Sequence, residues 1–235
     1  RAYYKLQQIY NDCLTTNPSQ KIQYQGSGMD LGASPGGWTQ VLHTNLQLPT
    51  ILSIDPATLA KRVLDLPGVQ HVRGDMGGEE AMEGMRRLAP FSCVVSDASV
   101  DFHEVLRKVV GSLDKAHSLL SSTTTASAGE KDTAVALLTT PAVIVITLKL
   151  PHKSKTSLDR NLKKALKALP KEIRTMMTWV GKSSSSAKGG KSPEEEEEEV
   201  ERTRLTVDFK VLHLMANTAS ERTCVIRFRD VEVTE

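Results

Sequence analysis

Short apolar runs alternate with amphipathic stretches along most of the 235-residue chain. The apolar runs predict strands at 28–32, 50–55, 70–75, 91–97, 142–150, 204–214 and 222–233. Apolar side chains spaced along one face predict helices over 1–14, 35–45 and 156–168, the last of them basic. Strands that alternate with helices indicate a doubly wound α/β sheet. The short polar connection between the last two strands indicates an antiparallel hairpin.

Two polar segments interrupt this pattern, at 121–132 and 181–201, and the second is of low complexity. Neither carries enough apolar surface to offset the entropy lost on ordering, so we expect both to be surface insertions. We therefore expect a single domain over 1–235 that carries these two insertions. Because the chain begins at Arg1 without Met, we expect that an N-terminal region precedes it.

Charge is distributed unevenly along the chain. The net charge is +2, but seven glutamates lie at 194–199 and 201. Without them, 30 basic residues stand against 21 acidic ones, a net charge of +9. A basic body suits a polyanionic partner, although an ordinary lysine-rich surface is an equally good interpretation of charge alone.

The cysteines and the apolar runs exclude some classes of protein. Cys13, Cys93 and Cys224 show no CxxC spacing, so we expect free thiols, no metal site and a reducing, intracellular location. No stretch approaches the roughly 18 apolar residues of a membrane helix, so no membrane partner is expected.

The connection after the first predicted strand, "DLGASPGGW" (30–38), is rich in small residues. Doubly wound sheets bind ligands at the carboxyl ends of their strands, and glycine lets the backbone approach a ligand closely. A dinucleotide site would follow G-x-G-x-x-G, whereas Gly32, Gly36 and Gly37 follow G-x-x-x-G-G with Pro35 inside the loop. This spacing disfavours a dinucleotide and favours S-adenosylmethionine.

Two further acids lie at predicted strand ends. Asp55 follows the second strand and is suited to accept hydrogen bonds from both hydroxyls of a ribose. Asp75 follows the third strand and is suited to accept one from an adenine amine. For each, the alternative interpretation is a carboxylate that caps a turn or a helix.

Five segments, in order, resemble the FtsJ/RrmJ-type ribose 2′-O-methyltransferase family: "RAYYKL" (1–6), "DLGASPGGW" (30–38), "VVSDAS" (94–99), "ITLKLPHK" (146–153) and "SERTCVIRF" (220–228). The fourth is most similar to the RlmM-like branch, the 23S rRNA cytidine 2′-O-methyltransferases. The resemblance implies a Rossmann-like S-adenosylmethionine-dependent methyltransferase sheet. The cofactor-binding positions expected are Gly32, Ala33, Pro35, Gly36, Gly37, Trp38, Asp55, Asp75 and Asp97. For Trp38, packing is the favoured role and an adenosine contact is the alternative.

That family carries a catalytic Lys-Asp-Lys-Glu tetrad, and the resemblance places it at Lys5, Asp97, Lys149 and Glu221. A ribose 2′-hydroxyl is a weak nucleophile, so the enzyme must align it and remove its proton. We expect Asp97 to orient Lys149, and Glu221 to orient Lys5 or the ribose. Whether Lys149 removes the proton or positions the hydroxyl stays open.

The resemblance implies structured RNA as the partner, with rRNA favoured. The basic residues expected to contact the RNA backbone are Arg1, Lys5, Lys153, Lys155, Arg160, Lys163 and Lys164. The alternatives are an mRNA cap or tRNA 2′-O-methyltransferase, or an inactive scaffold that binds S-adenosylmethionine or RNA. Many family members follow the fourth-strand acid with a Met-Ala-Pro-type loop, where this chain has "ASVDF" (98–102), so the target nucleotide stays open.

Overall fold

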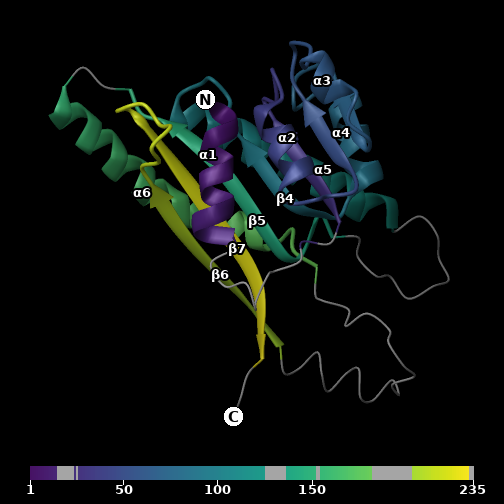
Figure 1. Cartoon of the computed structure of the whole chain (residues 1–235). Coiled ribbons are helices and arrows are strands. Elements are labelled where there is room, and N and C mark those ends of the chain that lie inside the picture. The colour runs from purple at the N-terminus through teal and green to yellow at the C-terminus, as the bar shows by residue number, and fades with distance from the viewer. Residues whose placement is uncertain (15–23, 25, 125–135, 152–153, 182–202, 233–235) are drawn as a thin grey trace.

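The computed structural model describes residues 1–14, 24, 26–124, 136–151, 154–181 and 203–232. These residues form one seven-stranded sheet in the order β3-β2-β1-β4-β5-β7-β6 (Figure 1). The strands are β1 (Ser27–Leu31), β2 (Ile51–Ile54), β3 (Val69–Val72), β4 (Phe91–Ser96), β5 (Leu138–Lys149), β6 (Thr203–Leu212) and β7 (Glu221–Glu232). Strands β1 to β5 are parallel, and β7 runs antiparallel to both β5 and β6. The predicted fold class is confirmed.

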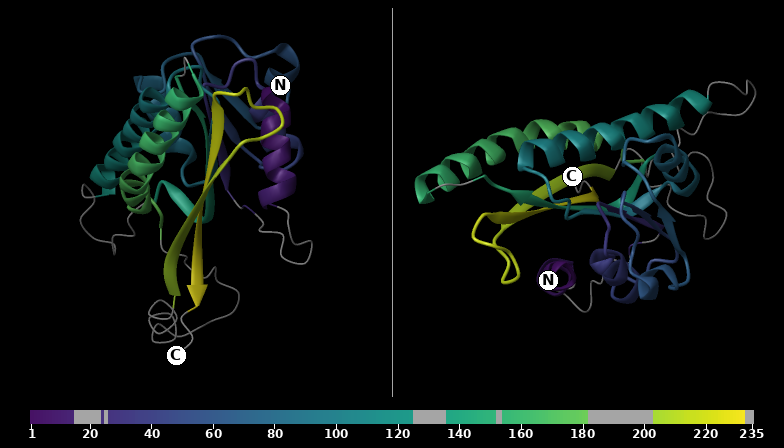
Figure 2. Two further views of the ribbon diagram at one scale, coloured as in Figure 1. Left: turned by 90° about the vertical axis from the view of Figure 1, so that its left-hand side faces the viewer. Right: turned by 90° about the horizontal axis from the view of Figure 1, so that it is seen from above.

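Helices cover both faces of the sheet. They are α1 (Ala2–Ile9) with the π-helical segment η1 (Tyr10–Leu14), α2 (Gly37–Thr44), α3 (Lys61–Leu64), α4 (Glu79–Leu88), α5 (Phe102–Thr124) and α6 (Lys155–Met177). Helices α1 and α2 pack on one face, while α4, α5 and α6 pack on the other (Figure 2). Helix α1 lies over β5 and β7, which brings the start of the chain to its last strand.

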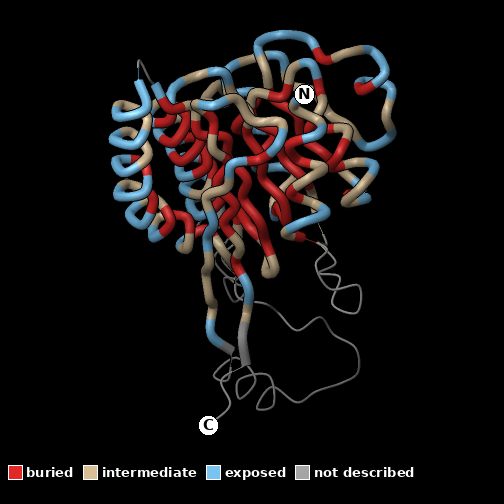
Figure 3. Tube along the Cα trace, turned by 60° about the vertical axis from the view of Figure 1, so that its left-hand side comes forward, coloured by how far each residue is buried: buried red, intermediate tan, exposed pale blue. Residues whose placement is uncertain are grey.

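The central strands are apolar on both faces because each face is covered. Alternate residues of β4 belong to different clusters, Val94 to the core under α4–α6, and Cys93 and Val95 to the core under α1 and α2. The buried residues therefore concentrate in the sheet and on the inward faces of the helices (Figure 3). This explains why every residue of β4 is buried and why β5 contains the continuous apolar run 142–146.

Several element boundaries differ from those expected. Strand β3 ends at Val72, so Asp75 lies in the connection to α4 rather than at the strand end. Strand β5 begins at Leu138, and α6 continues to Met177 instead of ending at 168. Helix α6 passes through Pro170 because Ile173 and Met176 beyond it are buried against the core.

Helices α4 and α5 were not predicted, although both are amphipathic. Helix α4 buries Ala81, Met82 and Met85 at helical spacing. Helix α5 extends to Thr124, so the first residues of the expected insertion at 121–132 are helical, which corrects that expectation. Residues 125–132 and 182–201 lie outside the described residues.

A buried polar network joins the start of α2 to the sheet. Thr39 Oγ1 donates to Asp30 Oδ2 at 2.7 Å and lies 2.9 Å from Ser53 Oγ. Burial raises the pKa of Asp30 to about 7, with Asp97 and Asp55 acting in the same direction and the hydrogen bonds from Thr39 opposing them. The network ties α2 to β1 and β2 directly beneath the loop that joins β1 to α2.

That loop depends on glycine at Gly36, which precedes α2 with a φ of 107°. A Cβ at this position would lie 2.8 and 2.9 Å from the two methyl carbons of Val63, a buried residue of α3. Both the backbone conformation and the close packing therefore disfavour a side chain here.

We expect the stability of this chain to depend on pH through Asp30. Its pKa is higher in the folded chain, about 7, than the roughly 3.9 of an unfolded aspartate. Between these values the folded state holds a proton that the unfolded state has lost. The stability from this group is present at low pH and is lost as pH rises toward 7, by at most about 1.4 kcal/mol per pH unit. Urea unfolding should show that the free energy of unfolding of the Asp30→Asn variant increases relative to that of the parent as pH rises. A difference between the two free energies that does not change with pH would contradict the raised pKa of Asp30.

The Gly36→Ala variant should lose about 1–3 kcal/mol of unfolding free energy, because it combines an unfavourable φ with a clash against Val63. Gly111→Ala is the matched control, since Gly111 lies within α5 with nothing within 4 Å of a Cβ. This control should gain about 0.5–1 kcal/mol. Denaturant unfolding of both variants is the measurement. Equal changes in unfolding free energy for Gly36→Ala and Gly111→Ala would refute the argument that Gly36 is required by its φ and by its contact with Val63.

Candidate active site

The candidate site lies at the carboxyl ends of β1 and β4, where the strand order reverses. The connections that follow these two strands touch. A Cβ on Gly32, whose φ is +79°, would lie 3.0 Å from Ala98 Cβ and 3.1 Å from Ala98 Cα. The glycine loop after β1 and the connection after β4 thus form one continuous surface.

The structure brings Asp55 to the glycine loop. The Ser34 amide donates to Asp55 Oδ2 at 3.0 Å, and the Ala57 amide donates to Oδ1 at 2.7 Å. The carboxylate therefore caps a turn, as the alternative interpretation expected. Each of its oxygens still has capacity for a second hydrogen bond, so the cap leaves room for a ligand hydroxyl.

Asp75 lies in the neighbouring connection between β3 and α4. The Gly77 amide donates to Asp75 Oδ1 at 2.9 Å, which again is a turn cap. The Gly74 amide donates to the Asp55 carbonyl oxygen at 3.2 Å. This bond places the connection of Asp75 beside that of Asp55.

Gly37 and Trp38 contact α1 rather than an open loop surface. A Cβ on Gly37 would lie 3.0 Å from the Tyr3 amide nitrogen. Trp38 is 2% exposed, and its Nε1 donates to the Ala2 carbonyl oxygen at 2.6 Å. These contacts support packing as the role of Trp38 and leave its ring no surface for a cofactor.

The structure brings Lys5, Asp97 and Glu221 together at one point. Lys5 is 2% exposed, and its Nζ lies 3.0 Å from Asp97 Oδ1 and 3.1 Å from Glu221 Oε2. Asp97 directly follows β4, and Glu221 begins β7. A buried ammonium requires partners of opposite charge, and this one has two.

Lys149 ends β5 and is paired in register with Glu221. Its Nζ donates to Ser99 Oγ at 3.0 Å and to the Asp97 carbonyl oxygen at 3.4 Å. The expectation that the Asp97 carboxylate orients Lys149 is therefore wrong, because that carboxylate faces Lys5. Glu221 contacts Lys5, which was one of the two expected arrangements.

Glu221 is held in its ionised form. Burial raises its pKa, but the Thr218 amide at 2.9 Å and the Lys5 ammonium outweigh this effect, and Arg1 adds to it. The net result is a pKa of Glu221 below its usual range. The carboxylate therefore keeps its negative charge at neutral pH.

Ser99 is the site residue that sequence reasoning missed. The one available signal was that "ASVDF" (98–102) departs from the loop expected after the fourth-strand acid. A serine two residues after an aspartate does not by itself indicate a contact with a lysine 50 residues further along the chain.

The basic residues expected to bind RNA are only partly placed. Lys155, Arg160, Lys163 and Lys164 are exposed on α6. Lys153 lies outside the described residues. Arg1 Nη2 lies 3.6 Å from Glu221 Oε1, so its guanidinium borders the tetrad.

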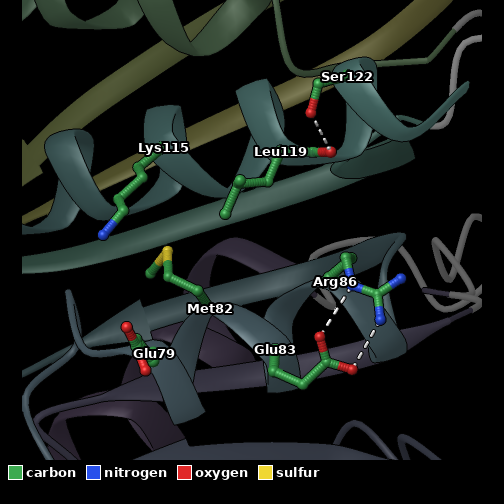
Figure 4. Close-up of a pocket in the computed structure, with 7 residues that line it drawn as sticks. All are labelled: Glu79, Met82, Glu83, Arg86, Lys115, Leu119 and Ser122. Atoms are coloured by element: carbon green, nitrogen blue, oxygen red, sulfur yellow. Dashed lines mark hydrogen bonds and ion pairs between the residues drawn. The ribbon is translucent and has the colours of Figure 1, made fainter. Parts of the chain in front are cut away.

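A separate hollow lies between α4 and α5 (Figure 4). It is lined by Glu79, Met82, Glu83, Arg86, Lys115, Leu119 and Ser122. Arg86 forms an ion pair with Glu83, and Lys115 donates to the Gly77 carbonyl oxygen at 3.3 Å. None of the tetrad residues lines this hollow, so it is not part of the candidate site.

In the part of the chain that the structure describes, no helix has the length and apolar character needed to cross a membrane.

Comparison with known proteins finds relatives that match parts of this chain in sequence. The ribosomal RNA large subunit methyltransferase M of Xylella fastidiosa is 42% identical over 76 residues, which cover 32% of this chain and 21% of that protein. The ribosomal RNA large subunit methyltransferase E of Natronomonas pharaonis is 32% identical over 122 residues, which cover 51% of this chain and 42% of that protein. The matches thus span less than half the length of these curated relatives.

Solved structures share the fold. The fibrillarin pre-rRNA processing protein of Methanococcus jannaschii matches with a TM-score of 0.50 at 11% identity, over 96% of this chain and 74% of that one. A Lactococcus lactis protein described as a putative hemolysin matches with a TM-score of 0.51 at 12% identity, over 98% of this chain and 88% of that one.

The sequence model of the FtsJ-like methyltransferases matches residues 1–196, which is most of the chain. The fold, the glycine loop and the grouped lysines and carboxylates agree with that match. The chain belongs to the FtsJ-like methyltransferase family.

Proposed function

We propose that this chain transfers the methyl group of S-adenosylmethionine to a ribose 2′-hydroxyl of RNA, with ribosomal RNA as the substrate. The observation that carries this proposal is the division of charge within the tetrad. Both carboxylates bind Lys5, whereas Lys149 beside them is hydrogen-bonded to two uncharged oxygens. The names of the two relatives, both ribosomal RNA large subunit methyltransferases, support RNA as the substrate class.

The glycine loop and Asp55 fit S-adenosylmethionine. The Ser34–Asp55 hydrogen bond places a carboxylate with spare acceptor capacity beside a loop without bulky side chains, which suits a nucleoside ribose. Gly32, Ala33, Pro35 and Gly36 would border its methionine part, and Asp75 would accept from the adenine amine. When bound, this cofactor supplies a methyl group on a positively charged sulfur.

The chain's own residues would align the acceptor and take its proton. Two carboxylates stabilise the positive charge of Lys5, which makes Lys5 a fixed cation that orients the site. Lys149 has neutral partners, so its Nζ is the suitable acceptor for the proton of the 2′-hydroxyl. Arg1 and the exposed lysines of α6 would bind phosphates without reading sequence.

We expect Lys149→Met and Lys5→Met to fail in different ways. Lys149→Met should abolish transfer of labelled methyl to RNA, keep S-adenosylmethionine binding and change stability by less than about 1 kcal/mol, because it removes a lysine with neutral partners. Lys5→Met should abolish methyl transfer too, and in addition it should lose about 3–5 kcal/mol of unfolding free energy. The reason for this loss is that two partly buried carboxylates are left without their cation.

Calorimetric titration, labelled-methyl transfer to total RNA and denaturant unfolding give the three readouts. Full methyl transfer by Lys149→Met would refute the proposed role of Lys149. An inactive parent chain that still binds S-adenosylmethionine would favour a scaffold over an enzyme.

Asp55→Ala should weaken S-adenosylmethionine binding about 10- to 100-fold, because a hydrogen bond to a charged group contributes about 1.5–3 kcal/mol. Asp65→Ala is the matched control, since Asp65 is an exposed acid that pairs with Lys61 away from the site. Calorimetry on both variants makes the comparison. Equal affinities for the two variants would exclude Asp55 from the cofactor site.

A further inference from the structure

The connection from β4 to α5 is anchored at both ends. At its start, the Asp97 carboxylate binds Lys5. At its end, Asp101 pairs with Lys149 as an isolated β-bridge, and its carboxylate accepts the amides of His103 at 2.9 Å and Glu104 at 3.1 Å. Between these ends, Ala98 packs against Gly32. Ser99 therefore lies on a short backbone segment whose position is fixed by three other elements.

Three acidic residues are paired with or hydrogen-bonded to Lys149 through the backbone, namely Asp97, Glu221 and Asp101, and the carboxylate of each is engaged elsewhere. Asp97 binds Lys5, and Glu221 binds Lys5 and the Thr218 amide. Asp101 caps the start of α5. On the side of α1, the cations Arg1 and Lys5 pair with Glu221, the residue opposite Lys149 in the sheet. The side chain that holds Lys149 Nζ at hydrogen-bonding distance is instead Ser99, whose hydroxyl lies at 3.0 Å, beside the main-chain carbonyl oxygen of Asp97 at 3.4 Å.

A hydroxyl differs from a carboxylate in one respect that matters for proton transfer. It accepts a hydrogen bond from an ammonium group and also donates one to a neutral amine, whereas an ionised carboxylate only accepts. A serine at this position therefore holds Nζ in both protonation states of the lysine. A carboxylate at the same position would favour the charged state.

We propose that Ser99 is the positioning residue for Lys149 in methyl transfer, holding Nζ beside the acceptor ribose before and after it takes the proton. This inference rests on the proposed function. In the step concerned, the 2′-oxygen forms a bond to the methyl carbon, the carbon–sulfur bond breaks with its electron pair remaining on sulfur, and the hydroxyl proton passes to Lys149 Nζ. In this proposal Ser99 acts through its hydrogen bond to Lys149 rather than on the methyl group or the ribose.

Three variants at this position test the proposal. Ser99→Ala should lower kcat about 10- to 100-fold, because an unanchored amine is misplaced relative to the ribose. Ser99→Thr keeps the hydroxyl and should keep most of the rate. Ser99→Asp should move the rise of the pH–rate profile upward by about one pH unit or more, because a carboxylate favours the charged form of a neighbouring lysine. Ser118→Ala, which removes an exposed hydroxyl of α5, should match the parent.

A second readout does not depend on methyl transfer. Acetic anhydride acylates uncharged amines, so mass spectrometry can follow the acetylation of Lys149 against pH. Ser99→Asp should move this curve to higher pH, while Ser118→Ala should leave it unchanged. Calorimetric titration should give the same S-adenosylmethionine affinity for all four variants.

The outcomes separate this inference from the proposed function. Parental rates and pH profiles in Ser99→Ala and Ser99→Asp, with Lys149→Met inactive, would overturn the role of Ser99 and leave the proposed function standing. An inactive parent chain would remove the proposed function. In that case the curve of Lys149 acetylation against pH is the remaining test of whether Ser99 acts on Lys149. An unshifted curve for Ser99→Asp overturns the role proposed for Ser99.

Discussion

The buried ammonium of Lys5 is the interaction on which the rest of the site depends. Taking a charge out of water costs several kcal/mol, and partners of opposite charge are needed to offset it. Here the partners come from the end of β4 and the start of β7, so one side chain joins residues 5, 97 and 221. Because Lys5 occupies both carboxylates, Lys149 is left with neutral oxygens. The chemical difference between the two lysines follows from this arrangement.

The position of Lys5 in turn depends on the loop that binds the cofactor in our proposal. Gly37 lets the backbone at the start of α1 approach closely, and Trp38 holds that backbone through the Ala2 carbonyl oxygen. The first part of the glycine-rich segment thus faces the candidate cofactor site, and its second part fixes the helix that carries Lys5. A change in this short segment is transmitted to both halves of the site.

Sequence reasoning found the central strands because both of their faces are buried, which leaves apolar runs such as 142–146. It missed α4 and α5, whose apolar residues are separated by charged ones and become a stripe only when wound into a helix. The tetrad residues came from resemblance, and the sequence could not pair them. The partner of each lysine depends on the register that sets Lys149 opposite Glu221 and on the path of the connection through Ser99.

The most direct test of the account is the chemical position of the transferred methyl group. RNA labelled by the parent chain with S-adenosylmethionine would be digested with alkali and separated by size. A methylated 2′-oxygen cannot attack the neighbouring phosphodiester, so the account predicts label in alkali-resistant dinucleotides. Label recovered in mononucleotides would place the methyl group on a base and would contradict a site built around a ribose hydroxyl.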